Sequence, residues 1–192
     1  NMKIGLFFGS FNPIHIGHLI IGNFIIENSD LDKLWFVVTP QNPFKKKSTL
    51  LDDHHRLEMV NLAVQKYPKF QSSNIEFSLP QPSYTIDTLV SLQEKYPEHQ
   101  FVLLMGEDNL NSFHKWKNFE QILKYHQILV YPRITSTPDT TPVSHPNISK
   151  IAAPVIEISS TVIRQMIKDK KNIRPMLPPE VFEYIDGSNL YK

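Results

Sequence analysis

Apolar runs of strand length alternate along this chain with amphipathic patterns of helical period, and this alternation predicts an α/β fold. The strand-like runs span Lys3–Phe8, Leu34–Thr39, Ser73–Phe77, Phe101–Met105, Gln127–Tyr131 and Ile151–Val155. The helical patterns span His18–Asn28, Asp53–Lys66, Ile86–Lys95, Phe119–Tyr125, Ser160–Lys168 and Pro179–Ile185. We therefore expect a doubly wound, mainly parallel, Rossmann-like sheet with helices on both faces and a C-terminal helical segment. Such sheets bind ligands at the carboxyl ends of their strands, where the strand order reverses.

The domain organisation is expected to be simple. A chain of 192 residues suits one domain with a core of its own, so we expect a single domain over residues 1–192. Residues 132–148 are rich in Pro, Thr and Ser, which is typical of an exposed, mobile loop. Asn1, which precedes Met2, is set aside as an addition from expression.

Composition excludes several classes of function. The 20 Lys and Arg residues against 19 Asp and Glu residues give a net charge of +1, which disfavours a protein that binds nucleic acid through bulk charge. The lack of cysteine excludes disulfides, thiolate nucleophiles and zinc held by cysteine. No signal peptide and no run of about eighteen apolar residues are found, so the expected location is the cytoplasm.

The most informative segment is Gly9–His18, which reads Gly-Ser-Phe-Asn-Pro-Ile-His-Ile-Gly-His. It joins an apolar strand to an apolar helix, and such a junction directs free N–H groups and the positive end of the helix dipole at an anion. Gly17 leaves room between the two histidines. His15 and His18 can face one spot and donate to phosphate oxygens near neutral pH. The alternative is a structural pair, with one histidine in a loop and the other packed on the sheet.

A second segment with related chemistry spans residues 158–164 and reads Ile-Ser-Ser-Thr-Val-Ile-Arg. Ser159, Ser160 and Thr161 are typical of a helix start, where hydroxyls and free N–H groups can bind an anion. Arg164 lies one turn further and can reach the same anion with two N–H donors. Taken alone, the pattern also fits an ordinary helix cap followed by a surface arginine.

Together these segments resemble the signatures of the HxGH nucleotidyltransferase superfamily, G-x-F-x-P-x-H-x-G-H and I-S-S-T-x-I-R, in the right order and about 140 residues apart. Within it, the chain most resembles the bacterial nicotinate-mononucleotide adenylyltransferases, also called nicotinate-nucleotide adenylyltransferases, over nearly its whole length. Further similar segments are Arg56–Met59 (R-x-x-M), Ser83–Leu89 (S-Y-T-x-D-T-L), and Gly106–Asp108 with Trp116 (G-x-D…W). Each of these also has a structural explanation, as a helix cap or a core residue.

The resemblance implies adenylyl transfer from ATP to nicotinate mononucleotide, giving nicotinate adenine dinucleotide and pyrophosphate in NAD biosynthesis. The catalytic residues it implies are His15, His18 and Arg164. The ATP-binding residues it implies are Gly9, Ser10, Phe11, His18, Gly106, Asp108, Arg133, Ser159, Ser160, Thr161 and Arg164. The residues it implies for nicotinate mononucleotide are Asn12, Lys45, Ser83, Tyr84, Thr85 and Trp116.

The expected mechanism depends on charge. The phosphate of a mononucleotide is already an anion, so its attack on the α-phosphorus of ATP needs positioning and charge neutralisation rather than a general base. We expect His15 and His18 to stabilise the α-phosphate while Arg164 and Mg²⁺ hold the pyrophosphate. The metal is expected to bind mainly to ATP phosphates and water, with no protein ligands. No nucleic acid or membrane is expected as a partner, and a homo-oligomer is left open.

The sequence departs from the family at two places. After the second strand the family usually has Pro, His and a basic residue, whereas this chain has Asn-Pro-Phe-Lys at residues 42–45. Phe44 cannot donate to a phosphate, and His54 or His55 are the candidates to replace the missing histidine. After the fifth strand the family's Arg-Pro-Gly becomes Pro-Arg-Ile at residues 132–134, which still leaves an arginine near the expected adenine site.

Three alternative functions follow from the same residues. A sister enzyme would use nicotinamide mononucleotide or phosphopantetheine as acceptor, although Tyr84, Thr85 and Trp116 favour nicotinate. A regulatory module that binds a nucleotide without turnover is favoured only by Phe44. Nucleic-acid binding through Lys45–Lys47 is the weakest alternative, because no aromatic residues alternate with these lysines.

Overall fold

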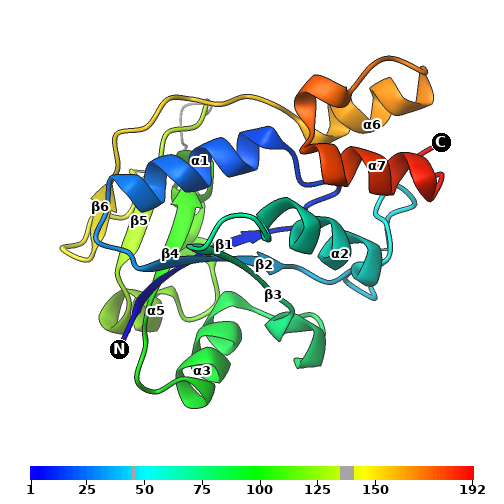
Figure 1. Ribbon diagram of the computed structural model, residues 1–192. Helices are drawn as coiled ribbons and strands as arrows, with labels where there is room; N and C mark the ends of the chain where they lie inside the picture. The colour runs from blue at the N-terminus through cyan, green and yellow to red at the C-terminus, as the bar shows by residue number, and fades with distance from the viewer. Residues whose placement is uncertain (45, 135–140) are drawn as a thin grey trace.

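The computed structural model describes residues 1–44, 46–134 and 141–192, and its strands form a parallel sheet (Figure 1). The strands are β1 (Lys3–Gly9), β2 (Lys33–Val38), β3 (Phe70–Ser73), β4 (Gln100–Gly106), β5 (Ile128–Tyr131) and β6 (Ile148–Lys150). They lie in the order β3-β2-β1-β4-β5-β6, with every neighbouring pair parallel. The chain proceeds outward from β1 to β3 and then from β4 to β6 in the opposite direction. The strand order therefore reverses between β1 and β4, and the predicted doubly wound α/β fold is confirmed.

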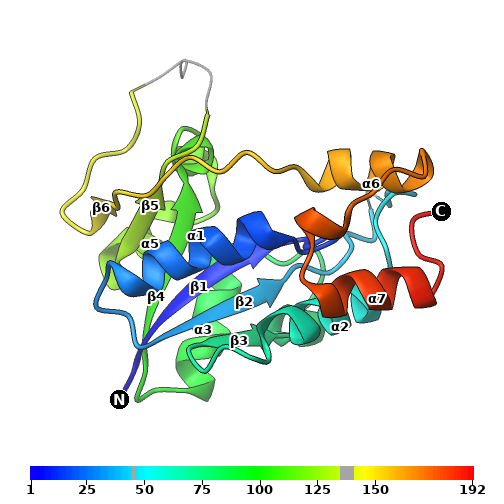
Figure 2. The same cartoon turned by 45° about the horizontal axis from the view of Figure 1, so that its top comes forward.

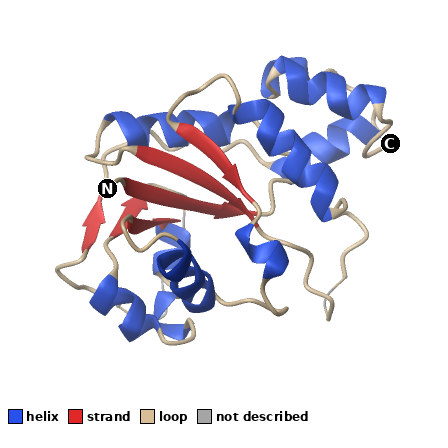
Figure 3. Ribbon diagram, turned by 60° about the horizontal axis from the view of Figure 1, so that its bottom comes forward, coloured by secondary structure: helices blue, strands red, loops and turns tan. Residues whose placement is uncertain are grey.

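Helices cover both faces of this sheet (Figure 3). The α-helices are α1 (Ile16–Glu27), α2 (Asp53–Val64), α3 (Thr85–Lys95), α4 (Glu107–Leu110), α5 (Phe119–Tyr125), α6 (Ser160–Lys168) and α7 (Pro179–Gly187). Short 3₁₀ helices are η1 (Ile75–Ser78), η2 (Phe113–Lys115) and η3 (Arg174–Met176). Helices α6 and α7 form the predicted C-terminal helical segment and lie beyond the carboxyl ends of β1 and β2 (Figure 2). Within the described residues, no helix is both long enough and apolar enough to cross a bilayer.

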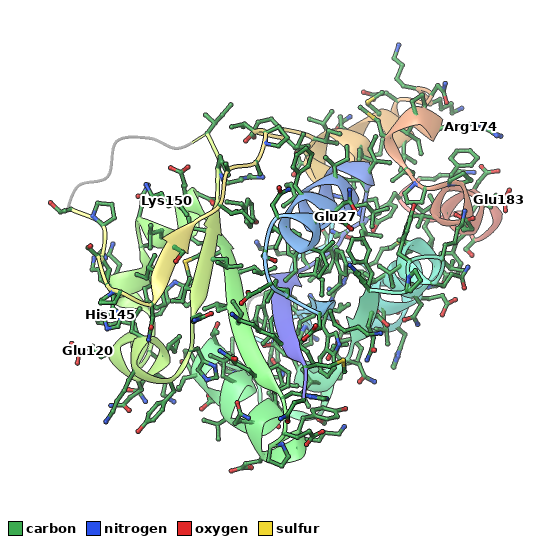
Figure 4. All side chains as sticks on the ribbon, turned by 60° about the vertical axis from the view of Figure 1, so that its left-hand side comes forward. Glu27, Glu120, His145, Lys150, Arg174 and Glu183 are labelled. Atoms are coloured by element: carbon green, nitrogen blue, oxygen red, sulfur yellow. The ribbon has the colours of Figure 1, made fainter. Side chains whose placement is uncertain are left out.

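Alternating strand residues face two separate cores, because successive side chains of a strand point to opposite faces of the sheet. Phe7 and Val102 contribute to the core beneath α1, α2, α6 and α7. Ile4, Leu6 and Leu103 contribute to the core beneath α3, α4 and α5. Five charged residues labelled in Figure 4 are exposed on the outside of the molecule: Glu27, Glu120, Lys150, Arg174 and Glu183. Because helices bury both faces of the parallel sheet, its central strands are nearly continuous runs of apolar residues.

Two of the predicted strands are wrong in position. The run Ser73–Phe77 was expected as a strand, but β3 ends at Ser73 and a 3₁₀ turn follows, in which the Phe77 N–H donates to the Asn74 carbonyl (2.9 Å). The run Ile151–Val155 was expected as a strand, but β6 is Ile148–Lys150. Its partner β5 ends at Tyr131 and is followed by a proline without an N–H, so no ladder continues past Ile151.

The bounds of the other predicted strands and helices lie within two residues of those observed. Helix α4 was not predicted, because it is a single turn. In the predicted loop 132–148, the described residues 132–134 and 141–147 have neither helix nor strand, and β6 begins at Ile148. Residues 135–140 of that loop lie outside the described residues. Its mobility stays a prediction.

A buried arginine holds together the sheet edge at which the strand order reverses. The Arg56 side chain of α2 is fully buried. Its guanidinium donates to the carbonyls of Ser10 after β1 (2.8 Å), Thr39 after β2 (2.7 Å) and Leu51 before α2 (2.9 Å). Asp53 compensates the charge through an ion pair of 2.6 Å. A guanidinium suits this position because its rigid set of N–H groups can satisfy several carbonyls at once.

Replacing this guanidinium with an apolar chain of similar length should destabilise the fold strongly. Arg56→Met leaves three carbonyls without their guanidinium donor and removes the cation paired with Asp53, and losing one partner of a buried polar cluster costs about 3–5 kcal/mol. Chemical denaturation measures the loss. The control is Lys66→Met, which removes an exposed pair with Glu180 and should leave the midpoint almost unchanged. Equal effects of the two variants would contradict the role of Arg56.

Candidate active site

The two histidines of the first segment form a reciprocal cap at the start of α1. His15 is the N-cap residue, and its Nδ1 accepts from the Gly17 N–H at 3.1 Å. The Nδ1 of His18 accepts in turn from the His15 N–H at 3.1 Å. Because each Nδ1 is an acceptor, each neutral ring carries its proton on Nε2. The cap therefore leaves both histidines with a fixed tautomer and one N–H donor each.

The same two rings are neutral at physiological pH. They are stacked, with centroids 3.8 Å apart and an angle of 26° between their planes. Burial, together with the charge of Arg133, lowers the pKa of His15 to about 4. Burial, His15 and Arg133 also depress the pKa of His18 well below its ordinary value. Two imidazoles can therefore stack without like-charge repulsion and still donate through Nε2, as the sequence predicted for phosphate oxygens.

The residues between β1 and the histidines are shaped by a buried aromatic ring. Phe11 has a left-handed backbone (φ 49°), and its side chain is only 2% exposed. Its ring meets the His18 ring edge-on at 5.1 Å and would lie 3.1 Å from a Cβ at position 9, which is why Gly9 suits that position. Phe11 was predicted to bind ATP, but its side chain belongs to the core, so only its backbone could face a nucleotide. Ser10 beside it is exposed.

The second predicted segment lies directly against the first. Ser159 is the N-cap of α6, as expected, and its hydroxyl accepts from the Val162 N–H (3.4 Å). The Ser160 hydroxyl donates to the Pro13 carbonyl at 3.0 Å. The Arg164 guanidinium donates to the Asn12 carbonyl at 2.9 Å. The start of α6 and the start of α1 therefore converge on one place at the carboxyl end of β1.

Asn12 has a buried side chain whose amide is already engaged by protein groups. The residue is 4% exposed. Its Nδ2 donates to the Thr49 carbonyl (2.8 Å), and its Oδ1 accepts from the Leu51 N–H (3.3 Å) and the Tyr191 hydroxyl (2.7 Å). Asn12 was predicted to contact the mononucleotide. These bonds give it a structural role in holding the loop, and direct ligand contact stays a prediction.

Gly106, Asp108 and Arg133 meet at the ends of β4 and β5. A Cβ at position 106 would lie 2.6 Å from Cγ of Arg133 and would also collide with the Asp108 carboxylate, so any larger residue would displace these two side chains. The Nε of Arg133 lies 4.0 Å from Oδ1 of Asp108. Arg133 is also the cation that lowers the pKa of both signature histidines. The arginine that follows β5 therefore reaches the site despite the altered order of its neighbours in the sequence.

The segment expected to bind the mononucleotide forms the start of α3. Tyr84 is the N-cap, α3 begins at Thr85, and Tyr84 is 47% exposed. Lys117 lies over the Tyr84 ring at 4.7 Å, which joins this segment to the residue after Trp116. The Trp116 ring is half-buried and meets Phe113 edge-on at 5.2 Å. Part of the Trp116 side chain therefore packs on the core, and only the remainder can face a ligand. Ser83, which was also predicted to bind the mononucleotide, is half-buried.

The two α2 histidines that were candidates to replace the histidine missing at Phe44 have contacts elsewhere. Phe44 is 79% exposed. Nδ1 of His55 is hydrogen-bonded to the Tyr184 hydroxyl of α7 at 2.7 Å, and His54 packs edge-on against Phe77. Neither histidine is directed by these contacts toward the signature loop. Lys45, predicted to contact the mononucleotide, lies outside the described residues.

Comparison with known proteins identifies the family. The profile of the family described as cytidylyltransferase-like matches residues 6–166. The chain belongs to the cytidylyltransferase-like family. A relative from Flavobacterium psychrophilum, named probable nicotinate-nucleotide adenylyltransferase, is 64% identical over 192 residues and covers 100% of each chain. Another relative of that name from Flavobacterium johnsoniae is 62% identical, again with 100% of each chain covered. The expected family is thereby confirmed.

A solved structure supports the fold of this family member. Plasmodium falciparum nicotinic acid mononucleotide adenylyltransferase complexed with NaAD superposes with a TM-score of 0.78 at 21% sequence identity. The match covers 100% of this chain and 98% of that one. The fold of this chain therefore recurs in a protein of distant sequence.

Sequence reasoning missed three residues that organise the site of this cytidylyltransferase-like chain. Arg56 was noted only as part of a helix motif, and Lys117 was not noted. Tyr191 was not noted at all. A cation within a predicted helix start was the only available signal for Arg56. No local pattern could indicate that Tyr191 contacts a residue 179 positions earlier.

The depressed pKa of His15 predicts a specific loss of stability in acid. With a pKa of about 4 in the folded protein and near 6.5 in the unfolded chain, the unfolded state binds more protons between these values. The free energy of unfolding therefore falls as the pH drops from about 6.5 to about 4, by up to roughly 3 kcal/mol from this group. His15→Asn keeps an acceptor for the Gly17 N–H but cannot titrate, so it should lose less stability.

Urea denaturation at about pH 7 and about pH 4.5 tests this expectation for the wild type and the variant. The two proteins should be similar in stability at the higher pH and differ at the lower one, with the variant the more stable. The same loss in both proteins on acidification would contradict the assignment.

Proposed function

We propose that this chain transfers the adenylyl group of ATP to nicotinate mononucleotide, giving nicotinate adenine dinucleotide and pyrophosphate as a step of NAD biosynthesis. One observation carries the proposal: the helix start at Ser160 and the guanidinium of Arg164 lie against the loop that bears the two histidines. Neutral donors and a cation thus surround one place at the strand ends. Relatives with the corresponding name over their full length support the choice of reaction.

The histidines would act on the α-phosphate. The Nε2–H groups of His15 and His18 are donors in the neutral rings, and a donor already held in place loses little energy in reorganisation when charge develops on a phosphate oxygen. A proton shuttle is unnecessary, because the attacking phosphate is already an anion. Their depressed pKa values keep both donors in one protonation state over the physiological range.

The start of α6 would hold the pyrophosphate portion. Thr161 and Arg164 both lie on the wall of a cavity of about 400 Å³ beside the loop at residues 48–51. Lys168 and Lys192 line the same cavity, so its charge is positive. An anion there gains from the cations and from the N–H groups at the helix start.

We propose Mg²⁺ as the metal of the reaction, bound through the phosphates of ATP and water. Within the described residues, no three His, Asp or Glu side chains are placed to hold a metal ion together. This supports a metal that arrives with the nucleotide, since Mg²⁺ commonly keeps several waters and binds substrate phosphates. The metal would neutralise charge on the pyrophosphate leaving group.

The remaining predicted residues would divide between two subsites. Gly106, Asp108 and Arg133 would bind the adenosine portion. Gly106 leaves space there because it has no side chain, and the Asp108 carboxylate and the Arg133 guanidinium beside it could accept and donate hydrogen bonds. Tyr84 and Trp116 would flank the nicotinate, with the exposed face of each available to an aromatic ring.

Release of pyrophosphate from ATP tests the function directly. The assay uses Mg²⁺ and, in parallel, nicotinate mononucleotide, nicotinamide mononucleotide and phosphopantetheine as acceptors. We expect nicotinate mononucleotide to give both pyrophosphate release and a dinucleotide product. ATP binding without release with any acceptor would instead favour a regulatory module.

Removing one histidine donor should slow the reaction far more than it weakens ATP binding. His18→Ala removes an N–H donor to the α-phosphate, and the loss of one such donor lowers turnover about a hundredfold or more. Steady-state rates and calorimetric ATP titration measure the two effects. His145→Ala is the matched control, because Nδ1 of His145 also accepts from a backbone N–H (3.0 Å, from Asn147), while His145 lies in the loop before β6, outside the signature loop. Unchanged turnover in His18→Ala would refute the role.

Nicotinate mononucleotide should be preferred over its amide by about ten- to a hundredfold in kcat/KM. The two acceptors differ only in a carboxylate against a carboxamide, and the N–H groups at the start of α3, near Thr85, favour negative charge. The NH₂ of the amide would leave such donors unpaired, at a cost of about 1–3 kcal/mol.

The preference should persist in Trp116→Phe, because a ring that stacks on the pyridine does not distinguish acid from amide. Binding of both acceptors should weaken in that variant. Competition of the two mononucleotides at fixed ATP and Mg²⁺ gives the ratio. Parity, or a preference for the amide, would overturn the choice of acceptor.

A further inference from the structure

The end of the described chain returns to the loop that carries the first signature. Helix α7 ends at Gly187, and the Leu190 N–H then donates to the Ile185 carbonyl at 3.0 Å. Asn189 and Tyr191 have left-handed backbones, with φ values of 58° and 66°. The chain therefore reverses direction after α7, with the Leu190 side chain anchored in the core (9% exposed). The reversal brings the Tyr191 ring to Asn12.

The Tyr191 hydroxyl donates to Oδ1 of Asn12 at 2.7 Å, which is the shortest of the hydrogen bonds to this side chain. The Leu51 N–H reaches the same oxygen only at 3.3 Å. Burial raises the pKa of the Tyr191 phenol well above its ordinary value, although Arg164 and Arg56 oppose this effect. The phenol therefore remains protonated and keeps its donor role at physiological pH.

Asn12 transmits this contact to the proposed anion site. Its side chain is held by Tyr191, while its backbone carbonyl accepts from Nη1 of Arg164 at 2.9 Å. The next carbonyl, that of Pro13, accepts from the Ser160 hydroxyl at 3.0 Å. The bonds to the Asn12 side chain anchor the backbone of residues 12 and 13, so losing the bond from Tyr191 would let this backbone shift and would move both carbonyl acceptors. A displacement of about 1 Å in a positioned group can cost orders of magnitude in rate.

We propose that Tyr191 is a positioning residue for the nucleotide: by fixing Asn12, it aligns Arg164 and the start of α6 toward the triphosphate of ATP. This inference rests on the proposed function for its substrate. It assigns Tyr191 no contact with the reacting atoms. The Asn12 side chain also holds the loop at residues 48–51, which lines the same cavity as Thr161 and Arg164. The effect should therefore fall on ATP rather than on the acceptor bound near α3.

The test is Tyr191→Phe, which retains the ring and removes only the hydroxyl. We expect KM for ATP to rise about five- to twentyfold, kcat to fall several-fold, and KM for nicotinate mononucleotide to stay within about twofold, which is the scale of losing one hydrogen bond to a positioned group. The matched control is Tyr184→Phe. It removes a hydrogen bond of the same length, 2.7 Å, between α7 and His55, away from the signature loop.

A purely structural role would lower the melting temperature of both variants alike and leave both Michaelis constants unchanged, and that result would overturn the inference. Equal rises in the two Michaelis constants would overturn it as well. A double-mutant cycle with Arg164→Lys is a further test. If Tyr191 acts through Arg164, then Tyr191→Phe should have little further effect on ATP affinity in a protein that already carries Arg164→Lys. Additive losses would argue against the coupling.

Calorimetric titration with ATP alone separates this inference from the proposed function. A wild-type protein that binds ATP but forms no dinucleotide would refute the function, while a weaker affinity in Tyr191→Phe than in Tyr184→Phe would still support the positioning role. Turnover in the wild type with the same ATP affinity in both tyrosine variants would refute the positioning role and leave the function intact.

Discussion

The buried guanidinium of Arg56 is the interaction on which the site depends. The loops after β1 and β2 and the segment before α2 must meet at one sheet edge, and each brings a backbone carbonyl that accepts a hydrogen bond from the buried Arg56 guanidinium. A single planar group with five donors satisfies them together, and Asp53 compensates its charge. An apolar side chain could fill the volume but would leave the carbonyls unpaired. The position of the signature loop therefore follows from hydrogen bonding as much as from the apolar core.

Electrostatics at this edge favour anions without the cost of a buried positive histidine. His15 and His18 are neutral because burial and Arg133 oppose their protonation, and their Nδ1 atoms are used in capping α1. The positive charge is carried instead by guanidinium groups, which keep their charge when partly buried. The neutral histidines therefore offer fixed N–H donors where negative charge would develop on a phosphate, and the guanidinium groups place permanent cations beside them. Such a site is organised before an anion arrives, which is the condition for electrostatic stabilisation of a transition state.

The parts of the fold that the sequence predicted well are those defined by periodicity. Continuous sequence patterns with clear starts mark strands β1, β2 and β4 and helices α2, α3 and α6. Strands β3 and β6 were misplaced because they are short edge strands, whose limits are set by the partner strand and not by their own residues. Ile75 and Ile151 read as strand residues because they are apolar, yet one begins a 3₁₀ turn and the other leaves the sheet where β5 ends.

The sequence by itself determined the chemistry of this protein: the histidine pair, the Ser-Ser-Thr helix start and the arginine one turn later are local, since each depends on residues within about four positions. Only the tertiary structure decided how these pieces meet. Ser160 and Pro13 are 147 positions apart, Arg164 and Asn12 are 152 apart, and Tyr191 and Asn12 are 179 apart. The neutrality of the histidines likewise depends on burial and on Arg133. Contacts and burial at such separations arise from packing of the whole chain, which no local pattern encodes.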